Sequence, residues 1–86
     1  MTIVWTNGCF DILHLGHIEL FKYARSLGDY LVVGVDTDER VKASKGKARP
    51  FNNVGDRVAM LQAVRHIDEV VVFGTDHELD TQVLLS

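Results

Sequence analysis

The feature that most constrains the fold is an uninterrupted apolar run at residues 30–35, Tyr-Leu-Val-Val-Gly-Val. A strand with one face in water alternates apolar and polar residues, but this run is apolar throughout. Such a run is typical of a strand covered on both faces, as in parallel sheets. Parallel neighbours need a long crossover, usually a helix, to connect them. The run therefore predicts an α/β fold in which strands and helices alternate.

The segment before this run has the pattern of a strand followed by a helix. Residues 2–6 are β-branched and aromatic, which predicts a strand that Asn7 and Gly8 break. From about His14 the apolar residues recur every three or four positions, as on one face of a helix. Gly28 is expected to end that helix as its C-cap. Residues 2–35 are therefore expected to form a βαβ unit with a right-handed crossover.

The second half of the chain is expected to continue the alternation of helix and strand. Its expected elements are a short helix from about Asp36 through Val41, a mobile basic loop at 42–53, a helix capped by Asn53 that runs to about Arg65, a strand at 69–73, and a third helix that starts near Asp76. This order predicts a Rossmann-like, doubly wound parallel sheet of three strands, incomplete at its C-terminal side. Residues 1–86 are thus expected to form a single domain that is a fragment of a longer one, or that another chain completes.

Composition narrows the classes of partner and compartment. The formal net charge of −3 argues against nonspecific binding to nucleic acid or to an anionic membrane, although a local basic patch can still bind a phosphate. A single cysteine rules out an internal disulfide and fits a reducing cytosol. The N-terminus lacks a basic segment before its apolar run, and no stretch approaches the roughly 20 apolar residues of a membrane span. We therefore expect a cytoplasmic protein.

The stretch from Thr6 to His17 joins the first strand to the first helix and contains the residues with the most chemistry. The start of a helix offers free N–H groups and a positive dipole end to an anion. His14 and His17 are three residues apart, so both imidazoles project from one helix face, and Gly16 between them lets a ligand approach the backbone. Phosphate oxygens suit such a site. Two other readings stay open: the histidines only cap the helix, or they bind a metal with Cys9, which would need further ligands.

The string Gly8-x-Phe10-Asp11-x-x-His14-x-Gly16-His17 resembles the signature of the nucleotidyltransferase superfamily that includes the cytidylyltransferases. Within that superfamily, the chain is most similar to the glycerol-3-phosphate cytidylyltransferases and to the adenylyltransferase domain of the bacterial ADP-heptose synthesis enzyme. The resemblance covers nearly the whole chain to about Phe73. It continues through residues 24–33, 36–38, 45–52, 56–57 and 68–70.

The resemblance implies a transfer reaction between two phosphates. A phosphate oxygen of a small sugar or polyol phosphate attacks the α-phosphorus of CTP or ATP, and pyrophosphate leaves. No covalent enzyme intermediate is expected, and catalysis is mainly positioning and electrostatic stabilisation. The resemblance also implies a Mg²⁺ ion carried in by the triphosphate and a homodimer. The sequence does not decide between CTP and ATP.

The resemblance also assigns roles to particular residues. The catalytic residues it implies are His14, His17 and Lys45. The further nucleotide-binding residues are Gly8, Cys9, Phe10, Asp11, Gly16, Lys47 and Arg65. The acceptor-binding residues are Lys45, Asp38 and Arg57. Asp11 is expected to hold the geometry of the turn rather than to take part in chemistry, and Cys9 is expected to fill space.

Several of these assignments have alternatives that the sequence leaves open. Lys42 could replace one of the two loop lysines, or the basic loop could be a solvated run of charge that Gly46 lets move. For Arg57 a structural salt bridge is an equal possibility, and Asp36 or Asp38 could cap the helix that follows them. The superfamily's later aspartate, arginine and serine/threonine-rich turn have no match after Phe73. A nucleotide-binding or dimerising module without catalysis is therefore the alternative function.

Overall fold

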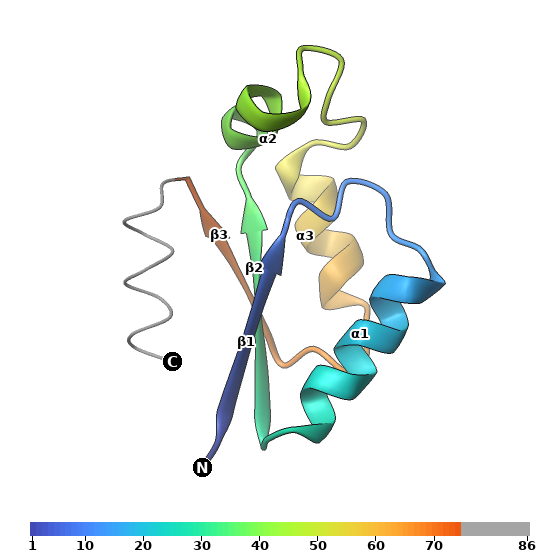
Figure 1. The fold of residues 1–86 in the computed structure, drawn as a ribbon, viewed down its shortest axis with the longest axis vertical. Helices are drawn as coiled ribbons and strands as arrows, with labels where there is room; N and C mark the ends of the chain where they lie inside the picture. Colours follow the sequence, from blue (N-terminus) through green and yellow to red (C-terminus); the bar gives the residue numbers. More distant parts are fainter. Residues whose placement is uncertain (75–86) are drawn as a thin grey trace.

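A three-stranded parallel sheet, with the strands in the order β1-β2-β3, lies at the centre of the structure (Figure 1). The structure is a computed structural model that describes residues 1–74. Its elements are β1 (Ile3–Gly8), α1 (Leu15–Ser26), β2 (Tyr30–Asp36), α2 (Asp38–Lys45), α3 (Val54–Gln62) and β3 (Glu69–Phe73). These elements confirm the expected Rossmann-like α/β class. The helix expected from Asp76 lies outside the described residues.

The central apolar run forms β2 and contributes side chains to both faces of the sheet. Leu31, Val33 and Val35 are fully buried and pack with Phe21 of α1 and Leu61 of α3. Figure 1 shows both of these helices on the same side of the sheet. Successive strand residues point to opposite faces, so these three alternate residues share the helix-covered face. The hydrophobic core therefore lies between β2 and the two helices.

The opposite face of the sheet explains why a glycine interrupts the run of large residues. A Cβ atom at Gly34 would lie 2.6 Å from ring atoms of Trp5 and 3.1 Å from the Phe73 ring. The Trp5 indole from β1 thus occupies the space that a side chain at position 34 would need. Gly34 lets aromatic rings from both neighbouring strands lie over β2.

Two predicted boundaries near the carboxyl ends of the strands are wrong. β1 does not break at Asn7 and Gly8, because both residues continue the parallel pairing and lie opposite Gly34 and Val35. Pairing with β2 outweighs the weak strand preference of asparagine and glycine. The strand therefore runs two residues further toward the turn that carries the signature.

The basic segment also contains more regular structure than predicted. α2 extends through Lys45, where the sequence predicted a loop from Lys42, and the Thr37 side chain caps it by accepting a hydrogen bond from the Arg40 N–H. Gly46 ends the helix with φ of 101°, a conformation that favours glycine.

The remaining helix ends match the prediction to within a few residues. Asn53 caps α3 as predicted, through a 2.9 Å bond from the Asp56 N–H, but α3 ends at Gln62, three residues before Arg65. α1 ends at Ser26 with Leu27 as its cap, so Gly28 follows the cap rather than forming it. Gly28 has a steric role instead, because a Cβ there would lie 2.7 Å from the Thr2 carbonyl oxygen.

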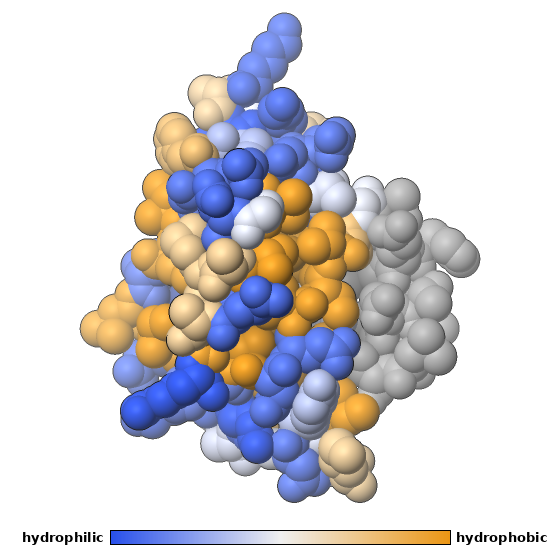
Figure 2. Space-filling model, turned by 180° about the vertical axis from the view of Figure 1, so that it is seen from behind, coloured by the Kyte–Doolittle hydropathy of each residue, from blue (hydrophilic) through white to orange (hydrophobic). Residues whose placement is uncertain are grey.

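The surface seen from behind carries a band of apolar residues between polar residues at the two ends (Figure 2). Large apolar side chains with exposed surface include Leu20 and Tyr23 of α1, its C-cap residue Leu27, and Met60 of α3. Within residues 1–74, no helix has the length and apolar character needed to cross a membrane.

Candidate nucleotide-binding site

The candidate site lies at the carboxyl ends of the strands, where the β1–α1 turn meets the connections around α2 and α3. In open parallel sheets, ligands bind in the crevice at these ends. The last residue of β1 is Gly8, and the turn from Cys9 to Leu13 leads to the start of α1. The same end of the sheet carries Asp36 at the end of β2. The signature turn is therefore placed where this fold binds ligands.

The two signature histidines form one unit at the start of α1. The His14 Nδ1 atom accepts a hydrogen bond from the Gly16 N–H at 3.0 Å, which makes His14 the N-cap. The His17 Nδ1 atom accepts one from the His14 N–H at 3.3 Å, and the two ring centroids lie 4.0 Å apart. Because each Nδ1 accepts, each neutral ring carries its proton on Nε2. Among residues 1–74 neither Nε2–H group has a hydrogen-bond acceptor, so the capping and ligand-binding readings are compatible.

The environment of His17 favours its neutral form. Burial is the main cause, and the neighbouring His14 ring adds to it: both lower the pKa of His17 below its usual value of 6.5. The Phe10 ring packs edge-on against the His17 ring, with their centroids 5.4 Å apart, and also packs on Phe21. Phe10 adopts this position with φ of 48°, which is unusual for a residue other than glycine. The buried phenyl ring thus supports the imidazole from the core side.

Gly16 is required by the position of the His14 ring. A Cβ atom at residue 16 would lie 2.8 Å from Cε1 and 2.9 Å from Nδ1 of His14. A side chain there would displace the ring from its capping position. Gly8 has a comparable role next to Phe10, because a Cβ there would lie 3.0 Å from the tip of the phenyl ring. Both glycines of the signature therefore make room for the rings that follow them.

Asp11 is buried and binds the segment that precedes α3. Its carboxylate accepts hydrogen bonds from the Arg49 Nε at 2.7 Å, the Phe51 N–H at 2.8 Å and the Asn52 N–H at 2.8 Å. The Asn52 side-chain amide donates in return to the Asp11 carbonyl oxygen. Burial acts to raise the pKa of Asp11, but the two N–H groups and the Arg49 guanidinium outweigh it and lower the pKa to about 2. The Asp11 carboxylate is thus committed to these protein groups.

Arg57 is fully buried and connects four segments around the turn. Its guanidinium donates to the carbonyl oxygens of Cys9 at 2.8 Å, Asp36 at 2.7 Å and Asn52 at 3.1 Å, and it forms an ion pair with Asp38 at 2.7 Å. The prediction that Arg57 contacts the acceptor disagrees with this arrangement, because no part of the side chain faces solvent. The alternative, a structural salt bridge, describes its contacts in the structure.

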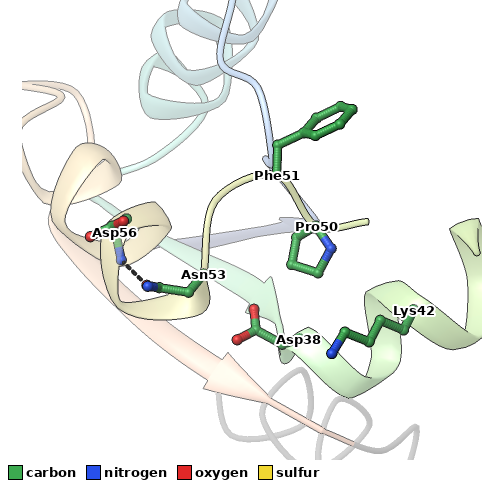
Figure 3. Close-up of a pocket in the computed structure, with 6 residues that line it drawn as sticks. All are labelled: Asp38, Lys42, Pro50, Phe51, Asn53 and Asp56. Carbon is green, nitrogen blue, oxygen red and sulfur yellow. Dashed lines mark hydrogen bonds between the residues drawn. The ribbon is translucent and has the colours of Figure 1, made fainter. Parts of the chain in front are cut away.

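A cavity of about 320 Å³ opens between α2 and the start of α3 (Figure 3). Its lining residues are Asp38, Lys42, Pro50, Phe51, Asn53 and Asp56. Asp38 and Lys42 place a carboxylate and an ammonium on its α2 side, as the close-up shows. Asp38 also holds Arg57, which in turn holds the Cys9 carbonyl, so the cavity adjoins the signature turn. Thr37, rather than Asp36 or Asp38, caps α2.

The remaining predicted site residues are divided between the two edges of the sheet. Lys45 at the end of α2 and Lys47 in the following loop are both exposed, and they follow the carboxyl end of β2. Arg65 lies after α3, in the connection that leads to the start of β3. The side chain of Arg65 is exposed, and its assignment to the nucleotide stays a prediction.

The described residues do not form a metal centre of their own. Within residues 1–74, no three His, Cys, Asp or Glu side chains converge on a point where they could hold an ion. The Cys9 thiol is half-buried and unbonded to another cysteine, and the Cys9 carbonyl oxygen is held by Arg57.

Comparison with known proteins identifies the family. Residues 5–83 match the model of the "Cytidylyltransferase-like" family. The chain belongs to the cytidylyltransferase-like family. The resemblance inferred from the signature is thereby confirmed, and this membership supports a nucleotidyltransferase.

Two relatives with known names have sequences similar to that of this chain. The chain is 51% identical over 79 residues to the "Bifunctional protein HldE" of Campylobacter fetus subsp. fetus, a match that covers 92% of this chain and 17% of the relative. It is 53% identical over 74 residues to that of Actinobacillus pleuropneumoniae serotype 5b, covering 86% of this chain and 16% of the relative. The chain thus spans about a sixth of the length of the curated relatives it matches.

A solved structure gives the same result for the fold. The crystal structure of the lipopolysaccharide core biosynthesis protein from Thermoplasma volcanium GSS1 superimposes with a TM-score of 0.82 at 31% sequence identity. The match covers 96% of this chain and 66% of that one.

Two residues of this cytidylyltransferase-like site received no role from the sequence. Arg49 and Asn52 are both bound to Asp11, although Asp11 lies 38 and 41 residues before them in the chain. They were visible only as members of the motif at residues 45–52. Periodicity and spacing report on neighbours along one element, so neither could pair a turn with a distant loop.

Proposed function

We propose that this chain forms the triphosphate-binding part of a nucleotidyltransferase that acts on a small sugar or polyol phosphate in the cytoplasm. A phosphate oxygen of the acceptor attacks the α-phosphorus of the nucleoside triphosphate. A new P–O bond forms, the bond between the α-phosphorus and the bridging oxygen breaks, and pyrophosphate leaves with that oxygen. The family assignment and the relatives named HldE support this proposal.

The observation that carries the proposal is the pair of Nε2–H donors at the start of α1. Both histidines use Nδ1 within the capping arrangement, which leaves their Nε2–H groups to donate. Negative charge builds on the phosphate oxygens as pyrophosphate departs, and fixed donors that meet this charge stabilise the transition state. The positive end of the α1 dipole acts in the same direction. In this proposal, His14 and His17 bind the triphosphate, with Gly16 leaving room and Phe10 holding the His17 ring.

The acceptor is proposed to occupy the cavity between α2 and α3. The cavity offers one ammonium and two carboxylates, from Lys42, Asp38 and Asp56, which suits a polar molecule that carries a phosphate and hydroxyl groups. Lys45 and Lys47 extend from the adjoining end of α2 and its loop, where long flexible side chains can reach a bound phosphate. Because Lys42 lines the cavity, it is at least as well placed as Lys45 for the acceptor.

We propose that Mg²⁺ enters with the triphosphate, as the resemblance to the family implies. Bound Mg²⁺ shields the charge of the β- and γ-phosphates. The choice between CTP and ATP is left to the assay. A homodimer is proposed from the resemblance, and the exposed side chains of Leu20, Tyr23 and Leu27, on α1 and its C-cap, give it apolar surface to bury.

Release of pyrophosphate tests the proposal directly. The full-length protein that contains this chain would be incubated with Mg²⁺, CTP or ATP, and glycerol 3-phosphate or heptose 1-phosphate. His14→Ala and His17→Ala are each expected to lower the rate at least about 100-fold, because each removes a donor to the charge that develops. Lys22→Ala, on the exposed side of α1, is the matched control. Nucleotide binding without pyrophosphate release from any acceptor would favour the non-catalytic binding module instead.

A further inference from the structure

Arg49 is held differently from the lysines of the basic segment. Its Nε atom donates to the buried Asp11 carboxylate at 2.7 Å, and its guanidinium carbon lies 4.7 Å from the centre of the Phe51 ring. The side chain of Arg49 is 28% exposed, whereas Lys42, Lys45 and Lys47 are all exposed. Two contacts therefore fix the plane of the guanidinium before any ligand arrives.

The contacts leave the outer half of this guanidinium unused. Among residues 1–74, no protein acceptor bonds to Nη1 or Nη2 of Arg49. Asp11 does not need these two nitrogens, because the Phe51 and Asn52 N–H groups complete its hydrogen bonding. Two parallel N–H groups in one plane match the spacing of two phosphate oxygens, which an ammonium cannot do.

The position of Arg49 places this pair of donors between the two parts of the proposed site. Arg49 is bound to Asp11, which directly follows Phe10, the residue that supports the His17 ring. It also directly precedes Pro50 and Phe51, both of which line the 320 Å³ cavity. A phosphate on either side of the reaction would therefore lie near it.

We propose that Arg49 is a phosphate-binding residue: Asp11 holds its Nε, and its Nη1 and Nη2 bind two oxygens of one substrate phosphate. This inference deepens the proposed function and rests on it for the nature of the substrate. The phosphate comes either from the triphosphate or from the acceptor, since both present the same oxygens. Asp11 is then a positioning residue that acts through Arg49.

Chemical modification tests the proposal without changing the protein. Butanedione reacts with the outer nitrogens of accessible arginines, and mass spectrometry measures the rate at each arginine. Tripolyphosphate with Mg²⁺ stands in for the triphosphate, and glycerol 3-phosphate for the acceptor. At least one of them is expected to slow modification of Arg49 by about fivefold or more, because a bidentate phosphate covers both nitrogens. Arg25, in the last turn of α1 and so at the opposite end of that helix from the histidines, is the internal control and should react equally fast throughout.

The outcomes separate the two phosphates and the two proposals. Protection by tripolyphosphate alone assigns Arg49 to the nucleotide, and protection by glycerol 3-phosphate alone assigns it to the acceptor. An unchanged rate at Arg49 with both probes overturns the inference. If a probe protects Arg49 but the protein releases no pyrophosphate, the inference stands and the proposed function fails. If the protein releases pyrophosphate but neither probe protects Arg49, the proposed function stands and the inference fails.

A substitution gives a second, independent measurement. Arg49→Lys keeps a cation for Asp11 but lacks the two outer donors. Its affinity for tripolyphosphate or glycerol 3-phosphate, measured by calorimetry, is expected to fall about tenfold while its melting temperature stays near that of the parent protein. Lys22→Gln removes a charge from the exposed side of α1 and controls for general electrostatics. If the Arg49→Lys variant binds both probes as tightly as the parent protein does, Arg49 is only a structural partner of Asp11.

Discussion

Replacing Asp11 by asparagine tests whether its carboxylate holds the turn and the loop together. In the parent protein one carboxylate oxygen accepts from Arg49 and Phe51, and the other accepts from Asn52. Asparagine offers only one oxygen, so its amide group must face at least one of these donors. The substitution therefore removes a charge that three donors stabilise, and it leaves a buried donor without an acceptor.

The expected loss in the free energy of unfolding follows from the lowered pKa of Asp11 and from the hydrogen bond that asparagine cannot make. The pKa of Asp11 falls from 3.8 to about 2 on folding, which corresponds to about 2 kcal/mol of stabilisation at pH 7. A buried donor without a partner costs about 1–3 kcal/mol more. We expect Asp11→Asn to lower the free energy of unfolding by about 3–5 kcal/mol. A chain of this length has roughly 4–13 kcal/mol in total, so the loss is large.

The dependence on pH distinguishes this cause from a general packing defect. Because the folded pKa lies below the unfolded value, the stabilisation is complete above about pH 4 and disappears as the pH falls toward 2. The parent protein should lose about 1 kcal/mol of it by pH 3, whereas the variant has no such carboxylate to titrate. The difference between the two proteins should therefore narrow by that amount between pH 7 and pH 3.

Urea unfolding followed by circular dichroism at pH 7, 5, 4 and 3 measures both quantities. Glu19→Gln makes the same chemical change at an exposed position of α1 and should alter the free energy of unfolding by no more than about 0.5 kcal/mol. A loss below about 1 kcal/mol for Asp11→Asn at pH 7 would refute the role assigned to the carboxylate. A difference that stays constant from pH 7 to pH 3 would refute its cause.

Three further predictions concern Arg57 and the histidine turn. Arg57→Leu leaves three carbonyl oxygens without their donor and should lower the free energy of unfolding, measured in urea titrations, by about 3–5 kcal/mol. The exposed control Arg65→Leu should lower it by less than about 0.5 kcal/mol, and equal losses in the two variants would contradict the bridging role of Arg57. Gly16→Ala should weaken calorimetric binding of tripolyphosphate about tenfold by displacing His14. Its free energy of unfolding should change by no more than about 1 kcal/mol, because the helix preference of alanine offsets the lost cap, and unchanged binding would speak against the His14 donor. In NMR titrations the pKa of His17 should lie below 6.5 in the free protein and rise when tripolyphosphate binds, and a free value at or above 6.5 would contradict the effect of burial.

The sequence predicted the sheet well because its evidence is local. The run at 30–35 is typical of a strand covered on both faces, and the structure buries Leu31, Val33 and Val35 against the helices and places Trp5 across Gly34. The predictions failed where pairing or capping decides the boundary. β1 continues through Gly8 because β2 supplies partners there, and α2 continues through Lys45 after Thr37 caps it.

The sequence placed the two histidines next to each other but could not identify the distant partners of the turn. His14 and His17 are adjacent on one helix turn, so spacing alone placed them together. Arg57 is different, because a buried arginine and a ligand-binding arginine look the same in a sequence. Its role became clear only from the carbonyl oxygens of Cys9 and Asp36, which the chain brings to it from two strand ends.

The segment before α3 shows how charge can order a stretch that has no regular structure. The Asn52 backbone lies between the two buried charges of the site: its N–H donates to the Asp11 carboxylate, and its carbonyl oxygen accepts from the Arg57 guanidinium. Each charge therefore binds the backbone group whose partial charge is opposite to its own. Since Asp11 also holds Arg49, and Arg57 also holds Cys9, one residue joins the proposed phosphate-binding arginine to the signature turn. Local propensity contains none of this information, which is why the sequence predicted a mobile loop where the structure has a tethered one.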